Sequence, residues 1–197
     1  MLKESLKLDF SQGTISKARA RLAEILKEQS IFRGNFVLAS GQKSDYYLDA
    51  RRTTLSPEGV SLVSYLILSM VQPTIKNVDG IAGPSIGADP IVSGVSQMSY
   101  LSGKPLKAGY IRKEVKKHGR NKMVEGPLEK NDNVILLEDV VTTGTSSLQA
   151  LNSLKKHGCN VNHVISIILR EEIGKELLEI EGKIQFHYIY RASELLD

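Results

Sequence analysis

The stretch from Val134 to Ser147, VILLEDVVTTGTSS, gathers residue types that do chemistry together. Four apolar residues lead into the acids Glu138 and Asp139, and a run of hydroxyl side chains around Gly144 follows shortly after. Backbone N–H groups and short hydroxyls at a helix N-terminus bind phosphate, and a glycine allows the backbone to come close to it. A carboxylate accepts hydrogen bonds from a diol. The stretch therefore predicts a ligand that has both a phosphate and vicinal hydroxyls.

Each half of this pattern also has an ordinary structural explanation. Ser and Thr before a helix often act as caps, and an acid pair at a strand end is often only solvated. A strand, two acids and a hydroxyl-glycine turn in this order favour a binding site over capping. No Gly-Lys-Ser/Thr follows and GxGxxG is absent, so a P-loop NTPase and a Rossmann dehydrogenase are both disfavoured.

A second chemical feature is the basic segment from Tyr110 to Met123. It holds six Lys and Arg residues and one acid, so it accounts for the net charge of +4, and the rest of the chain is nearly neutral. Its few apolar residues predict that it does not pack by itself. A solvated charged loop is one interpretation, and a lid that closes over a polyphosphate, with Gly119 as a hinge, is the other.

The composition excludes several classes of protein. A length of 197 residues suits one domain. The single Cys159 excludes an intramolecular disulfide and a Cys-rich metal cluster, and such sparse use of cysteine is typical of a reduced, cytoplasmic protein. The longest apolar run, 60–71, is too short and too rich in Ser to span a bilayer. There is no Trp and aromatic residues make up 6%, so no stacking surface for nucleic acid is evident.

The elements that must position these residues alternate along the chain. Periodicity predicts helices at 17–29, 57–71, 90–101 and 147–157, a hairpin at 36–49, and strands at 78–82, 107–111, 134–137, 161–169 and 184–190. This alternation favours an α/β fold with a doubly wound, mainly parallel sheet flanked by helices. Ligands of such sheets bind at the carboxyl ends of the strands.

These motifs resemble a known family. VILLEDVVTTGTSS resembles the motif for phosphoribosyl pyrophosphate (PRPP) of type I phosphoribosyltransferases, and IRKEVKKHG at 111–119 resembles the mobile catalytic loop of the orotate phosphoribosyltransferases. GNFVLASGQKSDYYLDAR at 34–51 and LREE at 169–172 agree with the same family. The resemblance implies the type I phosphoribosyltransferase fold as a single domain over 1–197. Residues 1–55 and the C-terminal segment would form a small hood, and 56–170 the PRPP-binding core.

The resemblance also implies transfer of ribose 5-phosphate from PRPP to orotate with Mg²⁺, in a homodimer whose loops close over the neighbouring subunit's site. Lys116, His118 and Asp139 would be catalytic, and Thr142 and Arg170 would contact orotate. The implied PRPP-binding residues are Arg112, Lys113, Lys116, His118, Glu138, Asp139, Val140, Val141, Thr142, Thr143, Gly144, Thr145 and Ser146. The protein ligands of Mg²⁺ are not implied.

The chain departs from the family at three places. Many members carry Lys where this chain has Ala39, and a Tyr-Lys pair where it has Ile86 and Gly87. The Asp that commonly precedes the matched arginine is Leu169. Two lysines that assist PRPP are therefore missing.

Several residues remain open to two interpretations. A purine phosphoribosyltransferase, or a PRPP-responsive regulator that binds nucleic acid, would share the PRPP motif. The alternation of the hairpin places one of Tyr46 and Tyr47 inward and the other outward, where it either lines the orotate site or does not. Asp89 is expected to cap a helix rather than support magnesium. His163 and His187 are expected to be packed or surface residues without a metal role.

Overall fold

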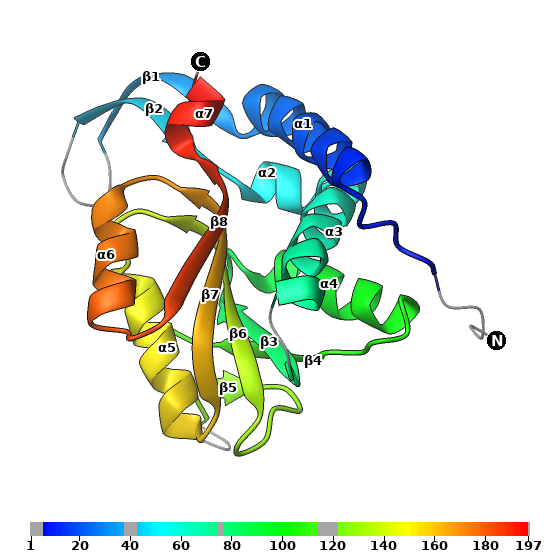
Figure 1. The fold of residues 1–197 in the computed structure, drawn as a ribbon. Helices are drawn as coiled ribbons and strands as arrows, with labels where there is room; N and C mark the ends of the chain where they lie inside the picture. Colours follow the sequence, from blue (N-terminus) through cyan, green and yellow to red (C-terminus); the bar gives the residue numbers. More distant parts are fainter. Residues whose placement is uncertain (1–5, 38–42, 75–76, 114–121, 197) are drawn as a thin grey trace.

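The fold is built on a six-stranded sheet with the order β5-β4-β3-β6-β7-β8 (Figure 1). The computed structural model describes residues 6–37, 43–74, 77–113 and 122–196. Neighbouring strands are parallel except for the antiparallel pair β4 and β5. The strands are β3 (Gly80–Pro84), β4 (Lys107–Ile111), β5 (Val124–Glu125), β6 (Asn133–Val141), β7 (Asn160–Leu169) and β8 (Gln185–Arg191).

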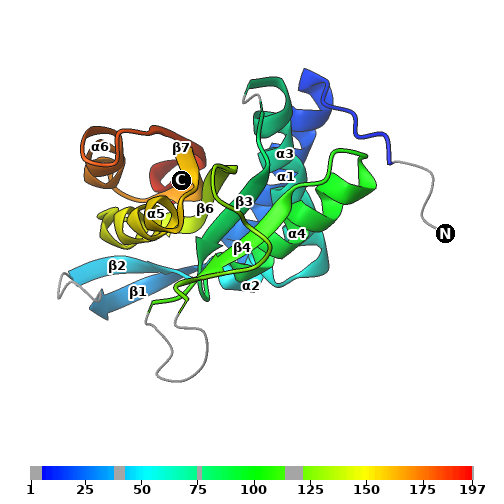
Figure 2. The ribbon, with the colours of Figure 1, turned by 90° about the horizontal axis from the view of Figure 1, so that it is seen from below.

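Helices cover both faces of this sheet (Figure 2). On one side lie α1 (Gln12–Gln29), α3 (Pro57–Thr74) and α4 (Asp89–Leu101), and on the other α5 (Thr145–His157) and α6 (Glu172–Ile180). Successive residues of β6 point to opposite faces, so Ile135 and Leu137 join one buried cluster and Leu136 joins the other. The doubly wound, mainly parallel α/β fold that the sequence predicts is thereby confirmed.

A smaller sheet lies beside the main one. It consists of β1 (Ile31–Val37) and β2 (Lys43–Leu48), paired antiparallel, and it leads into the short helix α2 (Arg51–Thr54). The C-terminal helix α7 (Ala192–Leu196) lies next to β1, where the Arg33 guanidinium donates to the Leu196 carbonyl. Buried Ser30 and Thr53 share a hydrogen bond of 2.7 Å between their hydroxyls, which ties the hairpin to α2.

The structure differs from the sequence prediction at some element ends. Helix α1 begins at Gln12, five residues before the predicted start, because Asp9 accepts bonds from the Ser11 amide and hydroxyl in the preceding turn. Helix α6 was not predicted, although its apolar residues Ile173, Leu177 and Ile180 have helical spacing. Strand β6 continues beyond the predicted end at 137 to Val141, because parallel pairing with β7 extends that far.

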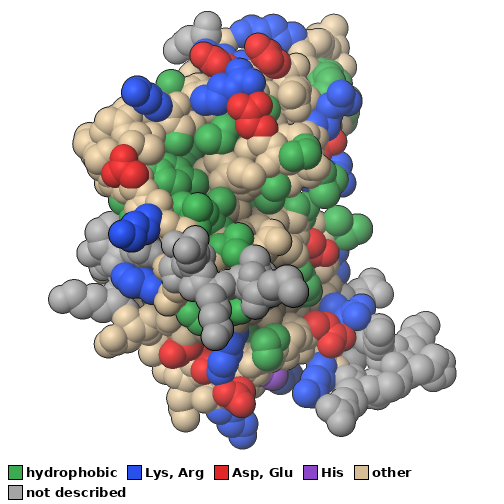
Figure 3. Space-filling model, turned by 90° about the vertical axis from the view of Figure 1, so that its right-hand side faces the viewer, with side chains coloured by type: hydrophobic (Ala, Val, Ile, Leu, Met, Phe, Trp, Pro, Cys, Tyr) green, Lys and Arg blue, Asp and Glu red, His purple; other side chains and the backbone are tan. Residues whose placement is uncertain are grey.

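The surface of the described chain is mixed in character. No helix in the described ranges combines the length and apolar composition needed to cross a membrane. Figure 3 shows the face that includes α3 and α4, where hydrophobic side chains gather between charged ones. Tyr100 of α4, with 59% of its surface exposed, is among the large hydrophobic residues that remain accessible.

Two histidines that the sequence left separate lie together in the structure. His163 on β7 and His187 on β8 have ring nitrogens 3.3 Å apart, and their rings stack at 5.5 Å between centroids. Burial lowers the pKa of both imidazoles, and the neighbouring His163 lowers that of His187 further. Because the lowered pKa values and the contact disfavour two charged rings, the pair behaves as a packed element of the sheet, as its predicted packed or surface role allows.

The histidine pair predicts a loss of stability in mild acid. Since the pKa of each ring is lower in the folded chain than its ordinary value near 6.5, the unfolded chain binds more protons as the pH falls below that value. Relative to His187→Gln, the wild type should lose unfolding free energy between pH 7.5 and 5.5, as the urea midpoints of the two proteins measure. His157→Gln, at the end of α5, is the control. An equal pH dependence in wild type and His187→Gln would contradict the prediction.

Candidate active site

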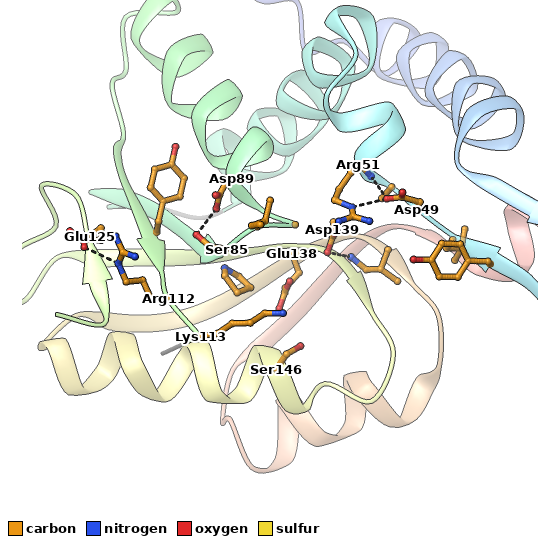
Figure 4. A pocket seen from close by; sticks show the side chains of 18 residues that line it. Asp49, Arg51, Ser85, Asp89, Arg112, Lys113, Glu125, Glu138, Asp139 and Ser146 are labelled. Carbon is orange, nitrogen blue, oxygen red and sulfur yellow. Dashed lines mark hydrogen bonds and ion pairs between the residues drawn. The ribbon is translucent and has the colours of Figure 1, made fainter. Parts of the chain in front are cut away.

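A large cavity lies at the carboxyl ends of β3, β4 and β6 and has a volume of about 1090 Å³. The hairpin end and the first residues of α2 close it from the other side (Figure 4). Its ionisable lining, in the described ranges, includes three cations and five acids: Arg51, Arg112, Lys113, Asp49, Asp89, Glu125, Glu138 and Asp139. This position agrees with the general rule for ligand sites of parallel sheets.

The two acids of the sequence motif lie on β6 itself and not beyond it. Because neighbouring residues of a strand point to opposite faces, Glu138 faces α5 and Asp139 faces the turn before α4. Both carboxyls line the cavity. The cavity therefore straddles the edge of the sheet and presents one acid from each face.

Burial dominates the chemistry of Glu138. Glu138 is only 4% exposed, and the Ser147 hydroxyl donates a hydrogen bond to its Oε1 over 2.6 Å. Loss of hydration raises the pKa of this carboxyl to about 8; the Ser147 hydrogen bond opposes the rise, Asp139 adds to it and Lys113 also opposes it. A neutral Glu138 carboxyl at pH 7 can both donate and accept a hydrogen bond.

Asp139 is held by its own backbone and by a glycine. Burial raises the pKa of its carboxyl, and the Val140 N–H, which donates to Oδ1 over 2.8 Å, works against this rise. A Cβ added at Gly87 would stand 2.5 Å from Asp139 Oδ2, so residue 87 has no room for a side chain unless the carboxylate moves. A lysine at this position would therefore require the Asp139 carboxylate to move.

The hydroxyl turn that follows β6 is shaped by a left-handed glycine. Gly144 is the N-cap of α5 with φ of 78°, and a Cβ there would lie 2.6 Å from the carbonyl oxygen of Gly174 on α6. Thr143, Thr145 and Ser146 are exposed around the open N-terminus of α5, and Ser146 also lines the cavity. The amides of this first turn and its hydroxyls form an arrangement that can bind a phosphate.

The basic segment is described only at its two ends. Arg112 lies just after β4, where its Nε donates to Glu125 Oε1 over 2.9 Å and its N–H donates to the Met123 carbonyl over 2.9 Å. Lys113 follows and lines the cavity beside Glu138 (Figure 4). Lys116, His118 and the hinge candidate Gly119 lie outside the described residues.

Thr142 and Arg170 are neighbours at the ends of adjacent strands. Val141 pairs with Leu169, and the Arg170 N–H donates to the Val141 carbonyl over 2.8 Å. The Arg170 guanidinium lies 4.6 Å from the centre of the Tyr46 ring, and its Nη2 donates to Ser44 Oγ over 3.1 Å. Arg170 lines a smaller cavity of about 280 Å³ with Tyr46, and it is absent from the lining of the large one.

The two tyrosines of the hairpin divide as their alternation predicts. Tyr46 packs against the core beneath Arg170, whereas Tyr47 is 40% exposed and lines the large cavity.

Asp89 is the first residue of α4, but it does not cap this helix. The hydroxyl of Ser85 donates to Asp89 Oδ1 over 2.8 Å, and the N-cap position is Ala88, which makes no side-chain hydrogen bond to the helix. The expected capping role of Asp89 is therefore wrong, because its carboxylate receives a serine hydroxyl and not a helix amide.

Sequence reasoning missed Arg51 and Asp49. Both line the large cavity, and the Arg51 Nε donates to Asp49 Oδ1 over 2.8 Å. In the sequence, these two residues were marked only by their position in LDAR, at the end of the hairpin motif.

In the described part of the chain no three His, Cys, Asp or Glu side chains come together as ligands for a metal ion.

Several known proteins of similar sequence and structure are orotate phosphoribosyltransferases. Orotate phosphoribosyltransferase of Rhodopseudomonas palustris BisB18 is 38% identical over 186 residues, covering 92% of this chain and 97% of that protein. The Aquifex aeolicus orotate phosphoribosyltransferase is 37% identical and covers 90% of this chain and 97% of its own. The crystal structure of the Mycobacterium tuberculosis enzyme with PRPP has a TM-score of 0.76 at 27% identity, over 91% and 99% of the two chains. No family model matches the chain.

The buried Glu138 predicts a pH-dependent difference in stability. Its folded pKa of about 8 lies above the ordinary value of 4.5, so its contribution is full below 4.5 and is lost as the pH rises through 8. Relative to Glu138→Gln, the wild type should lose on the order of a few kcal/mol of unfolding free energy between pH 5 and 8.5. Urea unfolding at several pH values measures this, with the exposed Glu176→Gln as control. A difference that does not vary with pH would contradict it.

Proposed function

This chain belongs to the orotate phosphoribosyltransferase family, and we propose that its large cavity is where the phosphoribosyl group passes from PRPP to orotate. The enzyme joins a ring nitrogen of orotate to C1 of PRPP, releases pyrophosphate and yields orotidine 5-monophosphate, a step of pyrimidine synthesis. The observation that carries the location is strand β6, which leads from buried Glu138 and half-buried Asp139 through a short turn to the open N-terminus of α5. Family membership also decides against a purine phosphoribosyltransferase and a nucleic-acid-binding regulator.

We place the 5-phosphate of PRPP at the turn from Thr142 to Ser146, with Val140 and Val141 leading into it. Exposed hydroxyls and the first amides of α5 support this, because both are donors suited to an anion. The ribose hydroxyls would then face Glu138 and Asp139. A neutral Glu138 can donate to one oxygen while accepting from another, and a charged Asp139 favours a positive sugar ring.

The leaving group is assigned to the basic segment. As the bond from C1 to pyrophosphate lengthens, the sugar gains oxocarbenium character and the pyrophosphate gains negative charge. Cations stabilise that developing charge, and each well-placed donor typically contributes about 3 kcal/mol. We assign this role to Arg112, Lys113 and Lys116, with His118 donating a hydrogen bond or proton to the leaving oxygen. Support comes from Arg112 and Lys113, which line the cavity.

Magnesium suits this cavity as a companion of the substrate. The described lining offers separate carboxylates without a cluster of three ligands, which fits an ion held mainly by pyrophosphate oxygens and water, with Asp139 or Asp89 nearby. Bound there, Mg²⁺ neutralises charge on the leaving pyrophosphate.

Orotate is assigned to Thr142 and Arg170, with Tyr47 on the outward side of the hairpin. The guanidinium of Arg170 is a planar fork that pairs with a carboxylate or a ring carbonyl. Its stacking on Tyr46 and its bond to Ser44 hold that fork near the hairpin. Orotate is an anion already, so its nitrogen needs little activation.

We further propose a cytoplasmic homodimer in which Lys116 and His118 of one subunit reach the other subunit's cavity, whereas Arg112 and Lys113 line the cavity of their own subunit. The hydrophobic side chains on the face of α3 and α4 support an interface of this kind (Figure 3). The hairpin, α2 and the C-terminal segment would act as a hood over the PRPP-binding core, residues 56–170.

The first test is the reaction itself. The wild type, mixed with orotate, PRPP and Mg²⁺, should consume orotate, which is followed by its ultraviolet absorbance. Omission of PRPP should abolish the loss, and adenine or hypoxanthine should not replace orotate. An inactive, well-folded protein would overturn the proposed location and the function together.

The assigned roles of Lys116 and Arg170 differ in kinetics. Lys116→Ala should lower kcat at least 10²-fold with little change in the KM for orotate, because it acts on charge that develops in the transition state. Arg170→Ala should chiefly raise the KM for orotate, about 10-fold or more. Steady-state kinetics decide between them, with the exposed Lys156→Ala as control. Equal changes in kcat and orotate KM for Lys116→Ala would remove its leaving-group role.

A further inference from the structure

Arg51 is a cation of the large cavity to which neither the sequence motifs nor the roles assigned above give a function. It is the first residue of α2, and its guanidinium extends into the cavity above Asp139 (Figure 4). Arg112 and Lys113, the other cations of the described lining, come from the end of β4 on a different wall. Arg51 therefore brings positive charge to the hood side of the cavity.

The present partner of Arg51 leaves it available to a ligand. Its bond to Asp49 Oδ1 uses Nε, so the two terminal nitrogens of the guanidinium take no part in it. The side chain is 46% exposed, and an exposed ion pair of this kind contributes only about 0–1 kcal/mol. A phosphate group can accept two parallel hydrogen bonds from the planar Arg51 guanidinium, which is a stronger interaction than one hydrogen bond to a single carboxylate oxygen.

At Gly87, which faces Asp139 from the turn before α4, the chain has no cationic side chain. Gly87 lies so close to Asp139 that a Cβ would stand 2.5 Å from Oδ2. Arg51 approaches the same aspartate from α2, and the positive charge of Arg51 acts on the Asp139 carboxyl. Of the possible walls around Asp139, α2 is thus the one that supplies a long cationic side chain in the described structure.

We propose that the Arg51 guanidinium binds the pyrophosphate end of PRPP and supplies the charge that this chain lacks at Ala39 and Gly87. This inference rests on the proposed function, because it takes PRPP as the ligand of the cavity. Before PRPP binds, the hydrogen bond from Arg51 Nε to Asp49 orients the guanidinium. Binding then requires only that the two terminal nitrogens donate to phosphate oxygens.

The adjacent Arg52 provides a matched control. It belongs to the same short helix, but its guanidinium lies 5.3 Å from the centre of the Phe32 ring and it does not line the cavity. A substitution there changes the same charge at nearly the same point of the chain. Any effect confined to Arg51 must therefore come from the cavity.

The experiment compares Arg51→Gln, Arg51→Lys and Arg52→Gln with the wild type. Steady-state kinetics at fixed Mg²⁺ should show the KM for PRPP raised about 10-fold or more in Arg51→Gln and less in Arg51→Lys, which keeps the charge. The KM for orotate should change less than 2-fold, and Arg52→Gln should match the wild type. Thermal unfolding checks folding; if Arg51→Gln is destabilised, the Arg51→Lys and Arg52→Gln pair decides the outcome.

Calorimetric titration of each variant with PRPP and Mg²⁺ separates this inference from the proposed function. If the wild type binds PRPP but fails to convert orotate, the proposed function falls, while a weaker PRPP affinity in Arg51→Gln still supports the role of Arg51. If the wild type is active and Arg51→Gln binds PRPP as Arg52→Gln does, the inference is overturned. A change in the KM for orotate alone overturns it as well.

Discussion

The burial of β6 on both faces is the constraint on which the site depends. Its apolar residues alternate between two hydrophobic clusters, so the strand cannot shift its register by one residue without exchanging the contents of both cores. Parallel pairing with β3 and β7 then brings the carboxyl ends of three strands to one edge. Glu138 and Asp139 take opposite sides of that edge because the same alternation continues through them.

The cavity carries more acids than cations among its described residues, although its proposed ligand is a polyanion. Burial reduces this conflict, because it raises the pKa of Glu138 to about 8 and so removes one negative charge that a phosphate would meet at pH 7. Arg112 and Arg51 are each paired with an acid, Glu125 and Asp49, before any ligand arrives. Because both pairs are weak and each uses only Nε of the guanidinium, the terminal nitrogens of Arg112 and Arg51 remain available for phosphate contacts.

The central sheet could be predicted because its strands are apolar runs bounded by turn residues, and the bounds of β4 agree with the prediction. The end of β6 could not, since pairing with β7 extends a strand beyond the point where its side chains become polar. Glu138, Asp139 and the hydroxyl turn form one local motif and were found from the sequence. Arg51 and the pair of His163 and His187 were not, because their meaning depends on residues far along the chain.

Gly144 and Gly174 face each other across the gap between the hydroxyl turn and α6, and each leaves room for the backbone of the other segment. A side chain at Gly144 would meet the Gly174 carbonyl, and one at Gly174 would lie 2.3 Å from the Thr142 carbonyl oxygen. Neither position can therefore carry a side chain unless the backbone of the facing segment moves. Helix α6, which the sequence analysis did not predict, in this way fixes the path of the backbone through the hydroxyl turn.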